Sequence, residues 1–127
     1  MLVFVYGTLK SGYSNHYACL RDAHFVGNAT TSHRYTMIDV GFPVLLTEGE
    51  GHVVHGEVYE VNTSTMERLD RLEGKGRMYD RVRRYVRMDD GSKARVYYYV
   101  GCANAWDARR GRPVEAKAGA YDWRPGA

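Results

Sequence analysis

Short runs of strand-forming residues, separated by glycine, proline and aspartate, follow one another along most of this chain. The clearest run is Val53–Val61. Its second half alternates, so that Val58 faces one side of the strand while Tyr59 and Val61 face the other. Because hairpin turns outnumber crossovers and helical patterns are few, the sequence predicts an α+β fold with a mainly antiparallel sheet, which closure would turn into a small barrel.

The other expected strands are bounded by the same turn residues. They are Leu2–Tyr6, Ala23–Thr31, Tyr35–Val40 and Phe42–Thr47, followed by a hairpin of Asp80–Met88 and Ala94–Val100 around a turn at Asp89–Ser92. A short helix, about His16 to Arg21, follows Ser14 and Asn15, which are candidate N-caps. The tail, Ala103–Ala127, is rich in glycine, alanine and arginine and is expected to be irregular.

A second, stronger helix is expected after the run at Val53–Val61. It begins with a capping box, in which the Ser64 hydroxyl accepts a hydrogen bond from the first turn and Glu67 reaches back. Its apolar stripe consists of Met66, Leu69 and Leu72. Gly74 or Gly76 supplies the left-handed residue at which the helix ends.

The length of 127 residues limits the possible architectures. Residues 1–127 are expected to form a single domain, because two dinucleotide-binding halves, or a strand–helix barrel of about 250 residues, do not fit. The apolar start, Met1–Val5, is far shorter than the roughly 18 apolar residues of a membrane span and lacks a basic leader. No membrane partner is therefore expected. Cys19 and Cys102 have neither a disulfide nor a zinc spacing, so a reducing, cytoplasmic location is expected.

The net charge of +3 comes mainly from 14 arginines, and the densest basic run is Arg77–Arg87. Arginine interleaved with tyrosine is found in proteins that follow a nucleic-acid backbone. However, the charge is small and the run is flanked by Asp80, Asp89 and Asp90, so an exposed strand face is favoured and no nucleic-acid partner is expected. Tyrosine supplies 11 of 16 aromatic residues, which suits a pocket or a half-exposed β surface better than a dry core.

One carboxylate of the stronger helix falls beside the apolar stripe. At about 100° per residue, Glu73 lies within roughly 20° of Met66 around the helix axis. Glu67 and Asp70 point to the polar side. Burial would raise the pKa of Glu73 toward neutrality, which suits a general acid/base. The alternative is that Glu73 reaches solvent in the last turn or pairs with Arg77.

The loop after the first strand, Tyr6–Lys10, is the second candidate site. Gly7 permits close approach of the backbone to a ligand, and successive N–H groups in such a turn bind a carboxylate or an oxyanion. A plain connection between strand and helix explains the loop equally well. The glycine spacing of a phosphate loop is absent, which argues against nucleoside triphosphates. His52 and His55 face opposite sides of a strand and make a poor metal pair.

Four motifs, in order along the chain, together resemble the gamma-glutamylcyclotransferase-like family. They are Phe4-Val5-Tyr6-Gly7-Thr8-Leu9-Lys10 with Asn15-His16, the strand Gly56–Val61, the helix end Leu69-Asp70-Arg71-Leu72-Glu73-Gly74, and Tyr79-Asp80-Arg81. The ending Tyr121–Arg124 is similar to that of bacterial members. The resemblance covers nearly the whole chain and is nearest the gamma-glutamylamine cyclotransferase branch.

The resemblance implies a small, closed, mainly antiparallel or mixed β-barrel with few flanking helices, a polar cavity, and neither metal nor organic cofactor. It implies an enzyme whose γ-glutamyl amine or γ-glutamyl amino acid substrate cyclises, releasing 5-oxoproline and the free amine. Glu73 is the expected general acid/base. The expected substrate-binding residues are Tyr6, Gly7, Thr8, Leu9 and Tyr79, with one of Tyr97 or Tyr98 facing the cavity.

The alternative function is a binding module on the same fold, which holds a small γ-glutamyl or amino-acid ligand without turnover. The leaving amine is not identified by any of the motifs. Selectivity for it is expected to lie in loops such as Gly49–His52 and in the tail.

Overall fold

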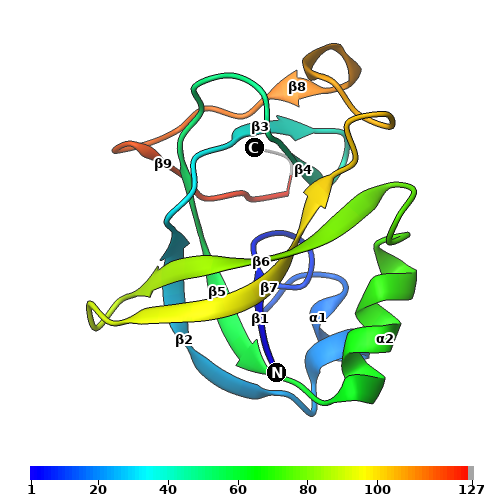
Figure 1. Ribbon diagram of the computed structural model, residues 1–127, viewed down its shortest axis with the longest axis vertical. Helices are drawn as coiled ribbons and strands as arrows, with labels where there is room; N and C mark the ends of the chain where they lie inside the picture. The colour runs from blue at the N-terminus through cyan, green and yellow to red at the C-terminus, as the bar shows by residue number, and fades with distance from the viewer. Residues whose placement is uncertain (126–127) are drawn as a thin grey trace.

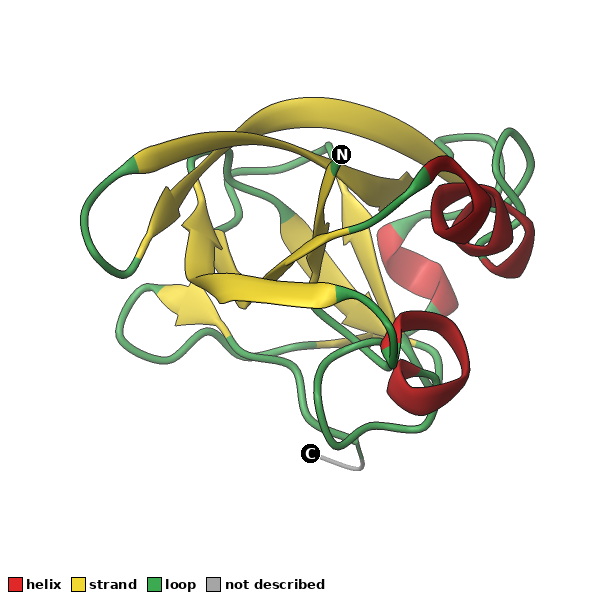
Figure 2. Cartoon of the chain, turned by 90° about the horizontal axis from the view of Figure 1, so that it is seen from below, coloured by secondary structure: helices red, strands yellow, loops and turns green. Residues whose placement is uncertain are grey.

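The computed structural model describes residues 1–125, and a closed five-stranded barrel forms its centre (Figures 1 and 2). The barrel consists of β1 (Leu2–Val5), β2 (His24–Thr31), β5 (Val53–Glu60), β6 (Tyr79–Met88) and β7 (Lys93–Gly101). The strands are hydrogen-bonded in the order β1-β7-β6-β2-β5, and β5 pairs with β1 to close the ring. The pairing of β1 with β7 is parallel and the other pairings in the ring are antiparallel, which confirms the predicted α+β barrel.

Alternation along the barrel strands divides the core into two layers. On β1, Phe4 belongs to the barrel interior, where it packs with Val58 and Tyr98. Its neighbours Val3 and Val5 belong to a second layer on the outside of the barrel. The period of two along a strand therefore produces both layers from one short segment.

Two helices cover this outer layer. The helices α1 (His16–Leu20) and α2 (Thr63–Leu72) contact each other and lie on one side of the barrel (Figure 2). They bury Leu20, Met66 and Leu69 against it. A third, short helix is η1 (Ala108–Arg110). In the described part of the chain, no helix has both the length and the hydrophobicity needed to cross a membrane.

The start of α2 corrects the predicted capping box. The N-cap is Asn62, in extended conformation, and its side-chain oxygen accepts a hydrogen bond from the N–H of Thr65 at 2.8 Å. Ser64 instead lies within the first turn and is exposed. The prediction was wrong because two overlapping polar patterns compete here, and asparagine is at least as good an N-cap as serine. The end is as expected, with Gly74 at φ +60° directly after Glu73.

The tail is more ordered than predicted, as far as Pro125; the last two residues of the predicted irregular segment lie outside the described part. A second sheet joins β3 (Thr36–Asp39), β4 (Pro43–Leu46) and the tail strand β8 (Arg112–Pro113) in the order β4-β3-β8 (Figure 1). Another tail strand, β9 (Ala120–Tyr121), pairs in parallel with β5. Strands of two residues have no sequence period, so no pattern in the sequence indicates them.

Candidate active site

A cavity of about 550 Å³ opens beside the barrel, where the loop after β1 meets Gly41–Pro43 and the segment between α2 and β6. Its lining includes all six residues that the sequence proposed for the site, which are Tyr6, Gly7, Thr8, Leu9, Glu73 and Tyr79. Their positions are therefore as expected, while their roles in binding and catalysis stay predictions.

Glu73 is half-buried at the C-cap of α2, where its own N–H still donates to the carbonyl oxygen of Leu69 at 2.9 Å. Within residues 1–125 its carboxylate forms no ion pair with Arg77 and accepts no hydrogen bond. Burial without a partner disfavours the charged form and raises the pKa of Glu73 to about 7. Of the interpretations that the sequence left open, the structure favours a desolvated carboxyl group over an ion pair.

The helix end that carries Glu73 is tied to the barrel through Asp70. The Asp70 carboxylate accepts hydrogen bonds from the Arg81 guanidinium at 2.9 and 3.1 Å and from the Tyr99 hydroxyl at 2.7 Å. Arg81 lies on β6 and Tyr99 on β7, so two adjacent strands hold the last turn of α2. Sequence reasoning placed Asp70 on the polar face and missed these contacts, although Asp70 and Arg81 both belong to the motifs that carried the resemblance.

The loop formed by Gly7, Thr8 and Leu9 is the opposite wall of the cavity. Asn15 donates to it twice, from its backbone N–H to the carbonyl oxygen of Thr8 at 2.9 Å and from Nδ2 to the Thr8 hydroxyl at 2.8 Å. Asn15 thus occupies the N-cap position of α1 without capping it, contrary to the role expected of its side chain. Among the described hydrogen bonds of this loop, none uses the N–H of Gly7, Thr8 or Leu9. These donors remain available to an anionic group in the cavity.

Gly7 is required by a close approach between this loop and β4. A Cβ atom at Gly7 would lie 2.6 Å from Cγ of Pro43, closer than side-chain carbons approach one another. Both residues line the cavity, so the contact also sets the width of the cavity at this point.

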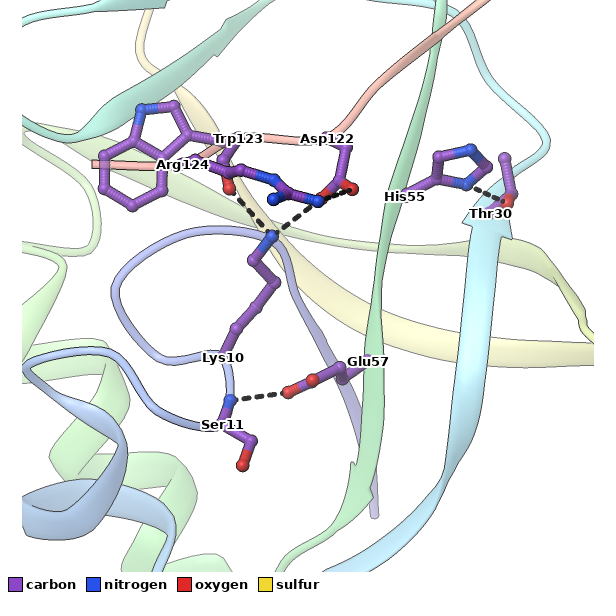
Figure 3. Close-up of polar contacts among 8 residues, drawn as sticks. All are labelled: Lys10, Ser11, Thr30, His55, Glu57, Asp122, Trp123 and Arg124. Atoms are coloured by element: carbon purple, nitrogen blue, oxygen red, sulfur yellow. Dashed lines mark hydrogen bonds and ion pairs between the residues drawn. The ribbon is translucent and has the colours of Figure 1, made fainter. Parts of the chain in front are cut away.

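The far side of the loop is anchored by Lys10 (Figure 3). The Lys10 side chain, with the residue only 7% exposed, donates from Nζ to Oδ1 of Asp122 at 3.1 Å and to the carbonyl oxygen of Trp123 at 2.9 Å. The N–H of Ser11 donates to Oε1 of Glu57 at 2.7 Å. The loop is therefore held between the C-terminal segment and β5, and Lys10 is part of its support.

Tyr6 and Tyr79 are buried, and both hydroxyl groups are engaged. Tyr6 donates to the carbonyl oxygen of Tyr99 at 2.6 Å, and Tyr79 donates to the carbonyl oxygen of Pro43 at 2.9 Å. Burial raises the pKa of both phenols, and the nearby charge of Glu73 adds to the effect. Both phenols therefore stay protonated at neutral pH, and backbone carbonyl oxygens fix their positions.

The third tyrosine at the cavity is Tyr99, so the expectation of Tyr97 or Tyr98 is wrong. The pairing of β6 with β7 turns Tyr98 into the barrel, where its hydroxyl lies 2.6 Å from that of Tyr35. Tyr97 lies on the outer surface beneath Arg81 and Arg83. Three consecutive tyrosines show no alternation of polarity, so the sequence does not indicate which of them faces the cavity.

Other candidate chemistry is not found in the described chain. Residues 1–125 contain no group of three or more histidine, cysteine, aspartate or glutamate side chains placed to hold a metal ion. Burial raises the pKa of the Cys19 thiol, so it is not an activated nucleophile. The loop Gly49–His52 and the described tail, which were expected to select the leaving amine, are not among the residues that line the cavity.

Comparison with known proteins identifies the family. Residues 3–124 match the family described as gamma-glutamyl cyclotransferase, AIG2-like. Gamma-glutamylaminecyclotransferase of Bos taurus is 43% identical over 95 residues, which cover 68% of this chain and 56% of the bovine one. The Mus musculus enzyme of the same name is 34% identical over 113 residues, or 77% and 76% of the two chains.

Solved structures lead to the same family. The crystal structure of an AIG2-like protein from Mus musculus has a TM-score of 0.76 to this chain at 28% identity, covering 99% of this chain and 97% of the mouse one. An uncharacterized protein from Pyrococcus horikoshii has a TM-score of 0.67, also at 28% identity, covering 90% and 85%. The chain belongs to the gamma-glutamyl cyclotransferase, AIG2-like family.

Proposed function

We propose that this protein cyclises the γ-glutamyl group of a γ-glutamyl amine or γ-glutamyl amino acid, releasing 5-oxoproline and the free amine. Membership of the family supports the reaction type. The observation that carries the assignment is the carboxyl group of Glu73, which has a pKa of about 7 and no partner within residues 1–125. It lies in the same cavity as three N–H donors of the loop at Gly7–Leu9.

Proton transfer is the task assigned to Glu73. The ionised carboxylate takes a proton from the substrate α-ammonium group, and the neutral nitrogen attacks the γ-carbonyl carbon to form a five-membered ring. The C–N bond to the amine then breaks as Glu73 returns the proton to the departing nitrogen. A second proton follows the same path, so the amine leaves as an ammonium ion, Glu73 ends ionised, and no water is consumed.

The rest of the cavity orients the substrate. Ring closure brings together two groups of one molecule, so holding the glutamyl chain in a bent conformation supplies a large part of the rate enhancement. The N–H groups of Gly7, Thr8 and Leu9 bind the substrate α-carboxylate or the oxyanion that forms on the γ-carbonyl. Tyr6 and Tyr79, fixed by their hydroxyl groups, form the walls against which the chain bends.

The test is the release of 5-oxoproline from γ-glutamyl dipeptides, γ-glutamyl-ε-lysine and γ-glutamyl alkylamines. Glu73→Gln keeps the shape of the side chain and removes the proton transfer, so kcat is expected to fall by about 10²–10⁴-fold. Glu67→Gln, at an exposed position of the same helix, is the matched control and should retain activity. Turnover that survives Glu73→Gln contradicts the role of Glu73. Ligand binding without turnover of any of these substrates favours the binding module.

The pH dependence provides a second readout of the same assignment. The carboxylate must be ionised to accept the first proton, so kcat/KM is expected to fall below about pH 7, the pKa of Glu73. An acidic limb near pH 4, the usual range of an exposed carboxyl group, argues against Glu73 as the base.

We also propose a reducing, cytoplasmic location. Cys19 and Cys102 are both free thiols in the structure, and unpaired cysteines are typical of proteins in reducing compartments. Fractionation of the cells that express the protein tests this, and recovery in an oxidising compartment would contradict it.

A further inference from the structure

The mouth of the cavity carries positive charge that the protein does not neutralise. Arg71, on the last turn of α2, and Arg77, before β6, both line the cavity and are exposed. Neither takes part in an ion pair with any of residues 1–125. Their neighbours Lys75 and Arg81 do, at 3.9 and 2.9 Å from the Asp70 carboxylate. Glu73 is the single carboxylate among the residues that line the cavity.

The same mouth is apolar between these charges. Phe42, Leu72 and Met78 line the cavity and are 37%, 45% and 40% exposed. Leu72 was expected in the buried stripe of the helix, and its position at the mouth corrects that prediction. Trp106 packs edge-on against Phe42 at 6.1 Å between ring centroids and so holds it in place. Exposed apolar side chains gathered at a cavity indicate a ligand that covers them.

The charges of the glutamyl half of the substrate are already accounted for by the proposed function. Its ammonium group faces Glu73, and its α-carboxylate, the one anionic group that it carries before reaction, is assigned to the N–H groups of the loop at Gly7–Leu9. The arginines and the apolar side chains of the mouth are therefore left for the part of the substrate beyond the scissile bond.

We infer that the leaving amine is an apolar α-amino acid, whose carboxylate is bound by Arg71 and Arg77 and whose side chain covers Phe42, Leu72 and Met78. This inference rests on the proposed function. Arginine binds a carboxylate through charge-assisted and often bidentate hydrogen bonds, which a neutral alkylamine does not accept. An amine with a second positive charge is repelled by the same pair of side chains.

The test compares substrates that differ in one feature of the leaving group. γ-Glutamyl-leucine and γ-glutamyl-3-methylbutylamine have the same side chain, and only the first has a carboxylate. γ-Glutamyl-glycine keeps the carboxylate and lacks the side chain, and γ-glutamyl-putrescine carries a second positive charge. γ-Glutamyl-leucine is expected to have a kcat/KM about tenfold or more above the other three. One charge-assisted hydrogen bond accounts for such a factor against the two amines, and burial of the leucine side chain accounts for it against γ-glutamyl-glycine.

Variants of the two arginines show where the carboxylate binds. Arg71→Gln and Arg77→Gln are each expected to lower kcat/KM for γ-glutamyl-leucine about tenfold, mainly by raising KM. The kcat/KM for γ-glutamyl-3-methylbutylamine should change less than about twofold. Arg87→Gln removes the same charge from an exposed position on β6 and should change neither. An equal loss of kcat/KM on both substrates would assign the arginines to the glutamyl carboxylate and overturn the inference. Equal kcat/KM values of the unaltered protein for the two substrates would also overturn it.

Binding to the Glu73→Gln protein separates this inference from the proposed function. Dissociation constants measured without turnover report the preference for γ-glutamyl-leucine over the 3-methylbutylamine compound directly. A tenfold preference in binding with no turnover by the unaltered protein would retain the ligand class and reject the enzyme. Turnover of all substrates without preference would retain the enzyme and reject the ligand class.

Discussion

Glu73 acquires its chemistry from the side of the helix on which it falls. Its position seven residues after Met66 follows from the helical period, so the sequence predicted a carboxyl group beside the apolar layer. The choice between a free carboxyl group and an ion pair with Arg77 depends on where the chain runs after Gly74, which no local pattern determines. Among residues 1–125 the structure forms no ion pair between these two side chains, and burial raises the pKa of Glu73 to about 7.

Ionising Glu73 is expected to cost stability. Its pKa in the folded protein, about 7, lies above the usual value of 4.5, so the folded state binds more protons between these two values. Stability conferred by the protonated form is therefore present at low pH and is lost as pH rises toward 7. Glu73→Gln should match the unaltered protein at pH 4.5 and be more stable at pH 8 by about 1–2 kcal/mol, allowing for solvent screening of a half-buried group.

Urea unfolding of both proteins at the two pH values measures this difference. Glu67→Gln changes an exposed carboxyl group of the same helix and should show no such dependence on pH. Equal stability of Glu73→Gln and the unaltered protein at pH 8 would show that the carboxyl group is not desolvated.

The helix α2 shows where local patterns are ambiguous. The chain from Asn62 to Glu67 contains two overlapping capping signals, and the sequence alone favoured the one that begins at Ser64. In the structure the helix starts two residues earlier than a cap at Ser64 allows, because Asn62 follows directly on Val61, which is buried just after the end of β5. The cap is therefore selected by the packing of the chain just before the helix. The sequence pattern of the helix itself does not contain this information.

Substitution at the two candidate caps distinguishes them. Asn62→Ala removes the acceptor for the N–H of Thr65 and is expected to lower the free energy of unfolding by about 1 kcal/mol. Ser64→Ala, at an exposed position inside the first turn, should change it by less than about 0.5 kcal/mol. Chemical denaturation measures both free energies of unfolding. A larger decrease for Ser64→Ala than for Asn62→Ala would mean that Ser64 is the N-cap after all.

The contact between the loop at Gly7–Lys10 and the C-terminal segment joins two parts of the chain that are remote in the sequence. Lys10→Met keeps most of the buried stem and removes the donors to Asp122 and Trp123. The loop at Gly7–Leu9 should then be less well held, so we expect KM for a γ-glutamyl substrate to rise severalfold. The free energy of unfolding should fall by about 1–3 kcal/mol, because a buried carbonyl group loses its donor.

Arg124→Met is the matched control for this prediction. Arg124 contacts the same Asp122 carboxylate at 3.6 Å, but its side chain is exposed, so both stability and KM should change little. Hydrogen exchange of the amides at residues 7–11 should become faster only with Lys10→Met. A loss of stability with KM and exchange unchanged would mean that Lys10 supports the tail and not the loop.

Across the whole molecule, the regular strands followed from the sequence, whereas the order of the tail did not. The barrel strands have clear periods or turn residues, and their predicted bounds differ from the observed ones by at most a residue or two. The tail is ordered by single contacts from other elements, such as the hydrogen bond from Nε1 of Trp123 to Oδ2 of Asp39 at 3.3 Å. Single contacts of this kind produce no periodic pattern in the sequence, so only the three-dimensional structure shows that the tail packs against the rest of the domain.

If residues 1–125 behave as a single domain, the tail and the barrel should unfold together. Trp123 is only 2% exposed and lies edge-on to Tyr13, so its fluorescence reports the attachment of the tail, whereas the far-ultraviolet circular dichroism reports the barrel. In a Trp106→Phe protein, where Trp123 is the remaining tryptophan, the two signals should give one coincident urea transition, as in a two-state domain. A fluorescence change at lower urea would mean that the tail detaches first. Since Trp123 also accepts the hydrogen bond from Lys10, that earlier step should raise KM severalfold, as Lys10→Met does, before the barrel unfolds.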